Sequence, residues 1–130
     1  MIVLDASVVV ELLTNGPLAA AIRDELAANT EPFIVPHLLD VEVVSALRSM
    51  AAGRRIDSHL CGQLLSDLSD LPAERYPHSP LLPRIWELRH QFTAYDAAYI
   101  ALAEATKSVL YTCDGKLRQG HRASVVVFKA

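Results

Sequence analysis

The chain has 130 residues, of which 52% are hydrophobic and 21% are charged, and its net charge is −3. This composition excludes an intrinsically disordered chain, because disorder requires low hydrophobicity and high net charge. The small negative charge argues against a protein that binds nucleic acid over its whole surface. A chain of this length builds one continuous core, so we expect a single domain over residues 1–130.

The sequence favours a cytoplasmic protein without a membrane span. No apolar run reaches the roughly 18 residues of a membrane-spanning helix, and the first residues enter a strand pattern without the basic segment of a signal peptide. Cys61 and Cys113 are far apart and form no CxxC motif, which suits a reducing compartment. We expect no zinc site, since no two histidines lie three or four residues apart.

Strands and helices alternate along the chain. Ile2–Leu4 predicts a short buried strand, a helix follows over Val8–Leu13, and Asn15-Gly16-Pro17 ends that helix. In chain order, the elements expected after it are helix Leu18–Ala28, strand Phe33–Val35, helices Leu38–Ala52 and Ile56–Leu71, strand Glu74–Tyr76, helices Leu81–Gln91 and Tyr95–Thr106, strand Val109–Tyr111, a helical turn at Gly115–Gln119 and strand Ser124–Val127.

The pattern of the strands predicts the fold class. Their cores are continuous apolar runs, which are typical of parallel strands buried on both faces. We therefore expect a three-layer α/β/α domain with a central parallel sheet of four to five short strands. Sheets of this type bind ligands beyond the carboxyl ends of their strands, near the point where strand order reverses.

Two carboxylates come directly after predicted strands. Asp5 follows Leu4, and Asp114 follows Cys113 at the end of the VLYT run. Each has an ordinary structural explanation, because Asp5 suits a helix N-cap and Asp114-Gly115 is a common turn pair.

Two further carboxylates lie on predicted helices. Glu42 is the only charged residue of VEVVSAL, residues 41–47, and its helix face carries Leu38 and Ala46. Asp96 opens the YDAAYIALA helix, whose following residues are almost wholly apolar. An intrahelical bond or a snorkelling stem explains Glu42 equally well, and compensation of the helix dipole explains Asp96.

The four carboxylates converge if the sheet is parallel, because strand carboxyl ends and the N-termini of the following helices then face one side. At ~4 Å two like charges repel by about 4 kcal/mol near a protein surface, so protons or a cation must neutralise such a cluster. An oxygen-only ligand set without His or Cys favours Mg²⁺ or Mn²⁺. Two such ions can activate water for phosphodiester cleavage.

These acids stand in four segments whose order resembles the PIN domain, and more narrowly the VapC-type toxins of type II toxin–antitoxin pairs. The segments are LDAS, PHLLDVEVVSALR, YDAAYIALA and LYTCDGKL, and together they extend the resemblance over essentially the whole chain. The resemblance implies a metal-dependent endoribonuclease that cuts structured RNA, either tRNA or rRNA. It implies that the catalytic, metal-holding residues are Asp5, Glu42, Asp96 and Asp114, with Mg²⁺ or Mn²⁺ as cofactor.

The resemblance also implies supporting residues and partners. Ser7 and Thr112 match polar positions that support the first and last acids, and the protein is expected to form a homodimer held inactive by a cognate VapB-like antitoxin. One departure concerns the acid that many members carry shortly after the last one, since Gly115, Lys116 and Leu117 follow Asp114 here. The choice between one and two metal ions therefore stays open.

Cations gather in two stretches. No acid follows Asp114, whereas the cations after it are Lys116, Arg118, Arg122 and Lys129, and a second group is Arg48, Arg54 and Arg55. These residues are compatible with a phosphate-facing rim or with ordinary solvated surface. Arg48, Lys116 and Arg118 are our candidate RNA-binding residues.

Three other functions remain as alternatives. A phosphoacceptor receiver-like domain shares the fold class, but it needs an acidic pair after the first strand and a lysine near the end of the last, whereas this chain has only Asp5 and Lys129 lies beyond Val127. A haloacid-dehalogenase-type phosphatase would need an aspartate where Ser7 stands. A non-catalytic PIN-like RNA-binding module would keep the fold without the reaction.

Overall fold

Five short strands form one fully parallel sheet at the centre of the structure, a computed structural model that describes residues 1–129. Their order across the sheet is β3-β2-β1-β4-β5. The strands are β1 (Ile2–Leu4), β2 (Phe33–Pro36), β3 (Ala73–Tyr76), β4 (Val109–Thr112) and β5 (Ser124–Val127). The central strand pairs Ile2 with Phe33 on one side and with Val109 on the other.

Helices fill every connection between the strands. The α-helices are α1 (Ala6–Thr14), α2 (Ala19–Ala27), α3 (Leu38–Ala52), α4 (Cys61–Ser69), α5 (Leu82–Glu87) and α6 (Ala94–Thr106). Short 3₁₀ turns are η1 (Ser58–Leu60), η2 (Ser79–Leu81) and η3 (Gly115–Arg118). Within residues 1–129, none of the helices combines the length and apolar composition that crossing a membrane requires.

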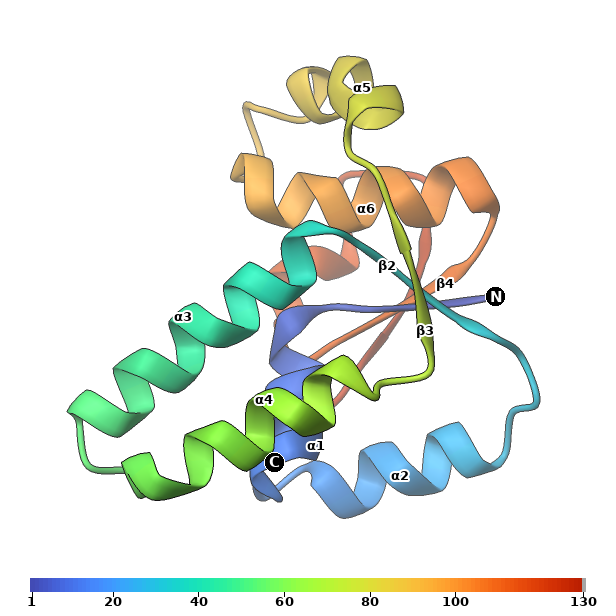
Figure 1. Ribbon diagram of the computed structural model, residues 1–130. Helices are drawn as coiled ribbons and strands as arrows, with labels where there is room; N and C mark the ends of the chain where they lie inside the picture. Colours follow the sequence, from blue (N-terminus) through green and yellow to red (C-terminus); the bar gives the residue numbers. More distant parts are fainter. Residues whose placement is uncertain (130) are drawn as a thin grey trace.

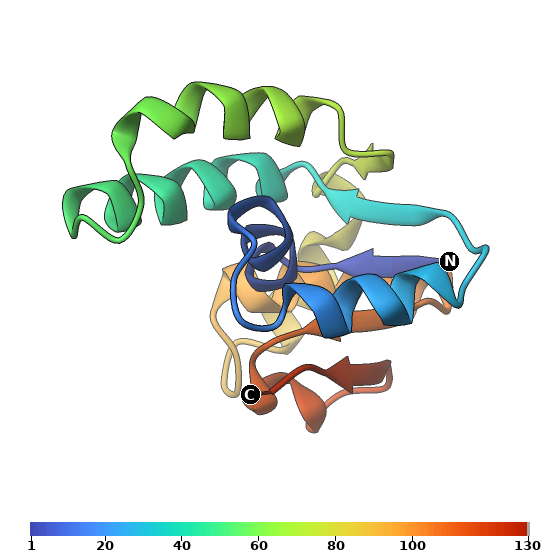
Figure 2. The same ribbon diagram turned by 90° about the horizontal axis from the view of Figure 1, so that it is seen from below.

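The helices cover the sheet from both faces. In Figures 1 and 2, α1 and α2 lie against one face, α6 lies against the other, and α5 packs outside α6. Helices α3 and α4 form a hairpin that projects beyond the carboxyl ends of the strands. The predicted three-layer parallel fold is confirmed, with five strands.

The reversal of strand order lies between β1 and β4. From β1 the chain moves outward to β2 and β3, then returns to the other side of β1 to add β4 and β5. The carboxyl ends of β1 and β4 therefore border the crevice in which sheets of this kind bind their ligands. Asp5 and Asp114 stand at these two ends.

The core explains why the strands and α6 read as apolar runs. All three residues of β1 are buried, and every residue of α6 from Ala97 to Ala103 is at most 3% exposed. The small alanines let this helix lie close to the sheet, where it packs across β1, β2 and β4. A helix buried on all sides has an N-terminus that is fixed relative to the strand ends.

Two predicted helices are shorter than the sequence pattern suggested. The stretch Ile56–Leu71 splits into η1 and α4, because the Asp57 carboxylate accepts the His59 N–H and starts a separate turn. The stretch Leu81–Gln91 is helical only through Glu87, since the N–H groups of Gln91 and Phe92 both bond to the Leu88 carbonyl in a turn that leads into α6.

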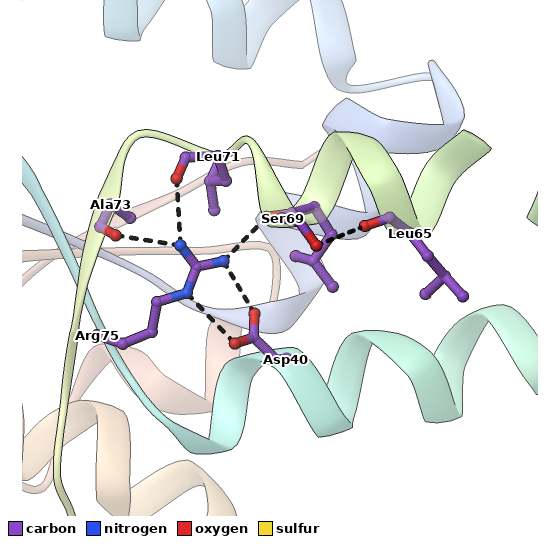
Figure 3. A network of polar contacts seen from close by, with 7 residues as sticks. Asp40, Leu65, Ser69, Leu71, Ala73 and Arg75 are labelled. Atoms are coloured by element: carbon purple, nitrogen blue, oxygen red, sulfur yellow. Dashed lines mark hydrogen bonds and ion pairs between the residues drawn. The ribbon is translucent and has the colours of Figure 1, made fainter. Parts of the chain in front are cut away.

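Arg75 on β3 ties the α3–α4 hairpin to the edge of the sheet (Figure 3). Its guanidinium donates to both carboxylate oxygens of Asp40, at 3.0 and 3.3 Å, near the start of α3. It also donates to three carbonyls at the end of α4 and the start of β3, those of Leu68, Leu71 and Ala73. All five guanidinium N–H donors are thereby used, which fixes the first turn of α3 in place.

A second ion cluster joins α5, α6 and the loop before β5. Arg84 donates to both carboxylate oxygens of Glu104, at 2.7 and 3.1 Å, and the backbone N–H of Arg122 donates to the same carboxylate at 2.8 Å. The Glu104 side chain is only 8% exposed. This cluster lies at the end of α6 opposite Asp96.

Candidate active site

Asp5 is the most enclosed of the four predicted acids, at 6% exposed. Its backbone N–H donates to the Tyr111 carbonyl at 3.1 Å, which continues the pairing of β1 with β4. One carboxylate oxygen accepts the Ser7 hydroxyl at 2.6 Å and the Val8 N–H at 3.1 Å. The other accepts the Thr112 hydroxyl. Asp5 therefore caps α1 and is held by donors from the first turn of α1 and from the end of β4.

The predicted supporting residues, Ser7 and Thr112, join the ends of β1 and β4. The Ser7 hydroxyl accepts the Cys113 N–H at 2.9 Å while it donates to Asp5. The Thr112 hydroxyl accepts the Asp114 N–H at 3.0 Å while it donates to the same carboxylate. Each hydroxyl therefore accepts a backbone N–H from the segment that follows β4 and donates to Asp5. These bonds hold the ends of β1 and β4 together.

Asp114 stands on the rim of this arrangement. Its carboxylate accepts the Lys116 N–H at 2.9 Å and caps η3, as the Asp-Gly turn pair predicts. The side chain is partly exposed, unlike that of Asp5.

Helices α3 and α6 supply the other two acids. Glu42 is half-buried on α3 and its Oε1 accepts the Tyr99 hydroxyl at 2.6 Å. Asp96 lies in the first turn of α6, where its N–H donates to the capping hydroxyl of Thr93 at 3.2 Å. Both helices begin beyond the carboxyl ends of the strands (Figure 1), so these acids reach the side on which Asp5 lies.

Burial is the main cause that raises the pKa of Asp5, of Glu42 and of Asp96 above their ordinary values. Neighbouring carboxylates add to each rise: Asp96 acts on Asp5, both of these act on Glu42, and Asp114 acts on Asp96. Hydrogen bonds from Ser7 and Thr112 offset part of the rise at Asp5. The four acids therefore form one electrostatic cluster, in which each charge opposes the others.

The four carboxylates are neighbours, but they do not converge on one point. Across residues 1–129, no group of three Asp, Glu, His or Cys side chains is arranged to surround a metal ion. The donor set is nevertheless the one that Mg²⁺ and Mn²⁺ prefer, since it contains only carboxylate and hydroxyl oxygens. A cation would also relieve the mutual repulsion that raises the pKa values. The residues present fit a hard divalent cation by their chemistry.

A groove leads away from the acids between α1 and α3. It has a volume of about 840 Å³, and its lining includes Ser7, Glu42, Tyr95, Cys113 and, just beyond the end of α3, Arg55. More of its wall is apolar than polar. The groove gives a long ligand access to one edge of the acidic cluster.

The predicted cations differ in how close they lie to the acids. Burial and then the charge of Asp114 raise the pKa of Asp96, and the charge of Lys116 offsets part of that rise, so Lys116 is close enough to act on Asp96. Arg118 is exposed on η3. Arg48 is exposed on α3 and is not part of the groove wall, whereas Arg55 is.

Two residues near the acids were not predicted from the sequence. Tyr99 contacts Glu42, and the signal for it was its spacing of three residues from Asp96, which places both on one face of α6. Lys129 lies beside the Asp114-Gly115 turn, where a Cβ on Gly115 would come within 2.8 Å of its Nζ. No local pattern connects Lys129 with that turn.

Comparisons with known proteins agree with this fold. A family model described as PIN domain matches residues 2–121. Ribonuclease VapC12 of Mycobacterium tuberculosis (strain ATCC 25618 / H37Rv) is 40% identical over 121 residues, which cover 93% of this chain and 92% of that protein.

Solved structures share the fold at lower identity. PAE2754 from Pyrobaculum aerophilum is similar with a TM-score of 0.73 and 23% identity, covering 95% of this chain and 81% of that one. A toxin–antitoxin complex from Klebsiella pneumoniae contains a chain with a TM-score of 0.68 and 19% identity, covering 97% of this chain and 96% of that one.

Proposed function

The chain belongs to the PIN domain family, and we propose that it is a metal-dependent endoribonuclease toxin that cleaves structured RNA by phosphodiester hydrolysis. The observation that carries the proposal is the cluster of four carboxylates at the reversal of strand order, with Asp5 at its buried end. The identity with a named ribonuclease over nine-tenths of the chain supports the reaction class.

Asp5, Glu42, Asp96 and Asp114 are the residues that would hold Mg²⁺ or Mn²⁺. When bound, such an ion supplies a Lewis acid that polarises the phosphate and the attacking water. Asp5 is held in one orientation by Ser7 and Thr112, so it presents its carboxylate without reorganisation. This preorganisation is the contribution of the strand ends.

A carboxylate of the cluster also serves as the base in the proposed reaction. Glu42 and Asp96 are half-buried, and their pKa values are raised by burial first and by neighbouring acids second. A base works best when its pKa approaches the working pH, so these two acids suit proton transfer better than an exposed carboxylate would.

The RNA backbone meets cations at the rim of the site. Lys116 lies near Asp96, and Arg118 follows it on the exposed surface of η3. We propose these two as phosphate contacts and Arg48 as a more distant one. The preference for tRNA or rRNA as substrate rests on the family resemblance.

The exposed apolar side chains of the helices suit protein partners. Large hydrophobic residues that are at least 39% exposed include Val41, Val44, Leu60 and Leu65 on and beside the α3–α4 hairpin and Leu82 and Trp86 on α5. A cognate VapB-like antitoxin and a second copy of the chain are the proposed occupants, and the structural similarity to a chain in a toxin–antitoxin complex supports the first. Light scattering of the purified chain, alone and with antitoxin, measures both assemblies.

A non-catalytic RNA-binding module is the second candidate. The observation in its favour is that no three acids within residues 1–129 surround a common point. Family membership gives no support to a phosphoacceptor receiver-like domain.

Mapping of cleavage sites in total cellular RNA tests the proposal. We expect the wild-type chain to cut one or a few structured RNAs when Mg²⁺ or Mn²⁺ is added, and to stop cutting in EDTA. Asp96→Asn should keep the fold and lose the cuts. RNA that is bound but never cut under any divalent metal would support the binding module instead.

A further inference from the structure

We propose that Tyr99 is a positioning residue of the acidic cluster, whose hydroxyl holds the Glu42 carboxylate in a fixed orientation for a divalent cation. The inference rests on the proposed metal-dependent function. It concerns a tyrosine that lies outside the set of acids and that acts through one of them.

The hydroxyl and the carboxylate are each other's partners. Tyr99 is 2% exposed, and its hydroxyl donates to Glu42 Oε1 at 2.6 Å. Among residues 1–129, Glu42 Oε2 accepts no hydrogen bond from a side chain or a backbone N–H. Tyr99 thus occupies one oxygen and leaves the other available to a cation.

The contact joins two helices that are distant in the sequence. Glu42 is on α3 and Tyr99 is on α6, 57 residues later. Tyr99 lies one turn after Asp96, so the same face of α6 carries both an acid of the cluster and the group that fixes another acid. The separation of Glu42 from Asp96 is therefore set by one rigid helix and one hydrogen bond.

Packing alone does not account for the hydroxyl. The α6 segment Ala97–Ala103 is buried and otherwise apolar, so phenylalanine would fill the same space without a polar atom. A buried hydroxyl is unfavourable unless it is paired, and here it is paired with a carboxylate. A hydroxyl donates and an ionised carboxylate accepts, which is also the form of the carboxylate that binds cations.

The test is the affinity of the chain for Mn²⁺ alone, measured by titration calorimetry at neutral pH. Tyr99→Phe removes only the hydroxyl, and we expect its Kd for Mn²⁺ to rise about 10-fold, as is typical when a residue that orients a metal ligand is lost. Tyr111→Phe is the matched control, because Tyr111 is 3% exposed and its hydroxyl bonds to Glu25 and Asn29 on and beside α2. Its Kd should stay within about twofold of wild type.

A double-mutant cycle separates positioning from a general structural effect. If Tyr99 acts through Glu42, adding Tyr99→Phe to Glu42→Gln should change the Kd for Mn²⁺ by less than about twofold. Equal effects of Tyr99→Phe in both backgrounds would overturn the inference. Cleavage gives a second readout: the Mn²⁺ concentration for half-maximal rate should rise.

The outcomes distinguish this inference from the function on which it rests. A wild-type chain that binds no Mn²⁺ would overturn both. If the wild-type chain binds Mn²⁺ and Tyr99→Phe binds it with the same Kd, only the role of Tyr99 is overturned. The unfolding temperature in EDTA checks the fold, and a lower temperature with unchanged Mn²⁺ affinity per folded molecule would assign the hydroxyl a structural role alone.

Discussion

At the scale of single residues, Asp5 serves the fold and the candidate site with the same carboxylate. It caps α1 through the Val8 N–H and receives hydroxyls from Ser7 and Thr112. The N-cap explanation is therefore confirmed, and the two hydroxyl contacts are compatible with the proposed site. A capping acid on the surface would need none of the partners that come from β4.

Thr112→Val tests how much the pairing of Asp5 contributes to the fold. The substitution keeps the shape of a side chain that is 0% exposed, but it leaves one carboxylate oxygen of Asp5 and the Asp114 N–H without their partner. We expect the free energy of unfolding, measured by urea denaturation without metal, to fall by about 1–3 kcal/mol.

Thr106→Val is the control for this prediction. Thr106 is the last residue of α6, and its hydroxyl bonds to the Leu102 carbonyl and to Ser108. Its loss strands no buried carboxylate, so the change should be smaller than at Thr112. Equal losses at both positions would mean that the Asp5 pairing has no special weight.

At the scale of elements, the α3–α4 hairpin depends on one side chain. Arg75 holds the start of α3 and the end of α4 through five hydrogen bonds, and Glu42 lies only two residues after Asp40 on the clamped turn. The clamp therefore sets where α3 presents Glu42 to the strand ends.

Arg75→Ala should loosen this hairpin without unfolding the sheet. We expect a loss of about 2 kcal/mol in the free energy of unfolding, because hydrogen bonds to a charged group are removed and three carbonyls lose a donor. Hydrogen exchange should accelerate most in the first turn of α3 and the last turn of α4. Arg89→Ala is the control, since Arg89 stacks on the exposed Trp86 and donates only to its carbonyl; uniform acceleration in both variants would contradict the clamp.

A comparison of predicted and observed bounds shows which elements could be predicted from local sequence patterns. The strand over Ser124–Val127 and the helix over Leu38–Ala52 have the predicted bounds, because a run of β-branched residues and a helix ended by Gly53 are local signals. The 3₁₀ turn at Ser58–Leu60 and the early end of α5 were missed. Both depend on side-chain and backbone hydrogen bonds that end a helix even though the apolar pattern of the sequence continues.

The candidate site likewise has residues that were predicted from the sequence and a contact that was not. The four acids and their two hydroxyl partners were predicted, because family spacing and the geometry of a parallel sheet bring strand ends and helix N-termini to one side. The Tyr99–Glu42 bond was missed, since its two partners are 57 residues apart and belong to helices that each read as ordinary apolar elements. Contacts of this kind become visible only when the helices are placed.

At the scale of the whole molecule, opposite ends of α6 carry carboxylates whose pKa values are shifted in opposite directions. Burial raises the pKa of Asp96 at its start. At its end, burial also opposes ionisation of Glu104, but the hydrogen bonds and charges of Arg84 and Arg122 outweigh it and hold the pKa of Glu104 below its ordinary value. An acid with a depressed pKa stabilises the fold above its unfolded pKa, and this contribution is lost as pH falls through the folded pKa.

Glu104→Gln should therefore destabilise the chain most near pH 7. The difference in unfolding free energy from wild type should shrink as the pH is lowered from 7 to 3, measured by urea denaturation in EDTA. Glu87→Gln is the control, because Glu87 is 64% exposed and lies 3.8 Å from Arg84, and we expect little effect at either pH. A difference for Glu104→Gln that grew on acidification would contradict the assignment.

The central claim for the whole molecule is that the carboxylates at the reversal of strand order perform metal-dependent RNA cleavage, and Asp5→Asn tests it most directly. The amide keeps one oxygen for the Ser7 and Val8 donors, turns its NH₂ toward the Thr112 hydroxyl, which can accept from it, and removes the charge that a cation needs. The measurement is the rate of cleavage of a structured RNA that the wild-type chain cuts, at saturating Mn²⁺, beside the unfolding temperature of each protein. We expect a loss of at least about 100-fold in rate while the protein remains folded. Cleavage by Asp5→Asn at the wild-type rate would contradict the account.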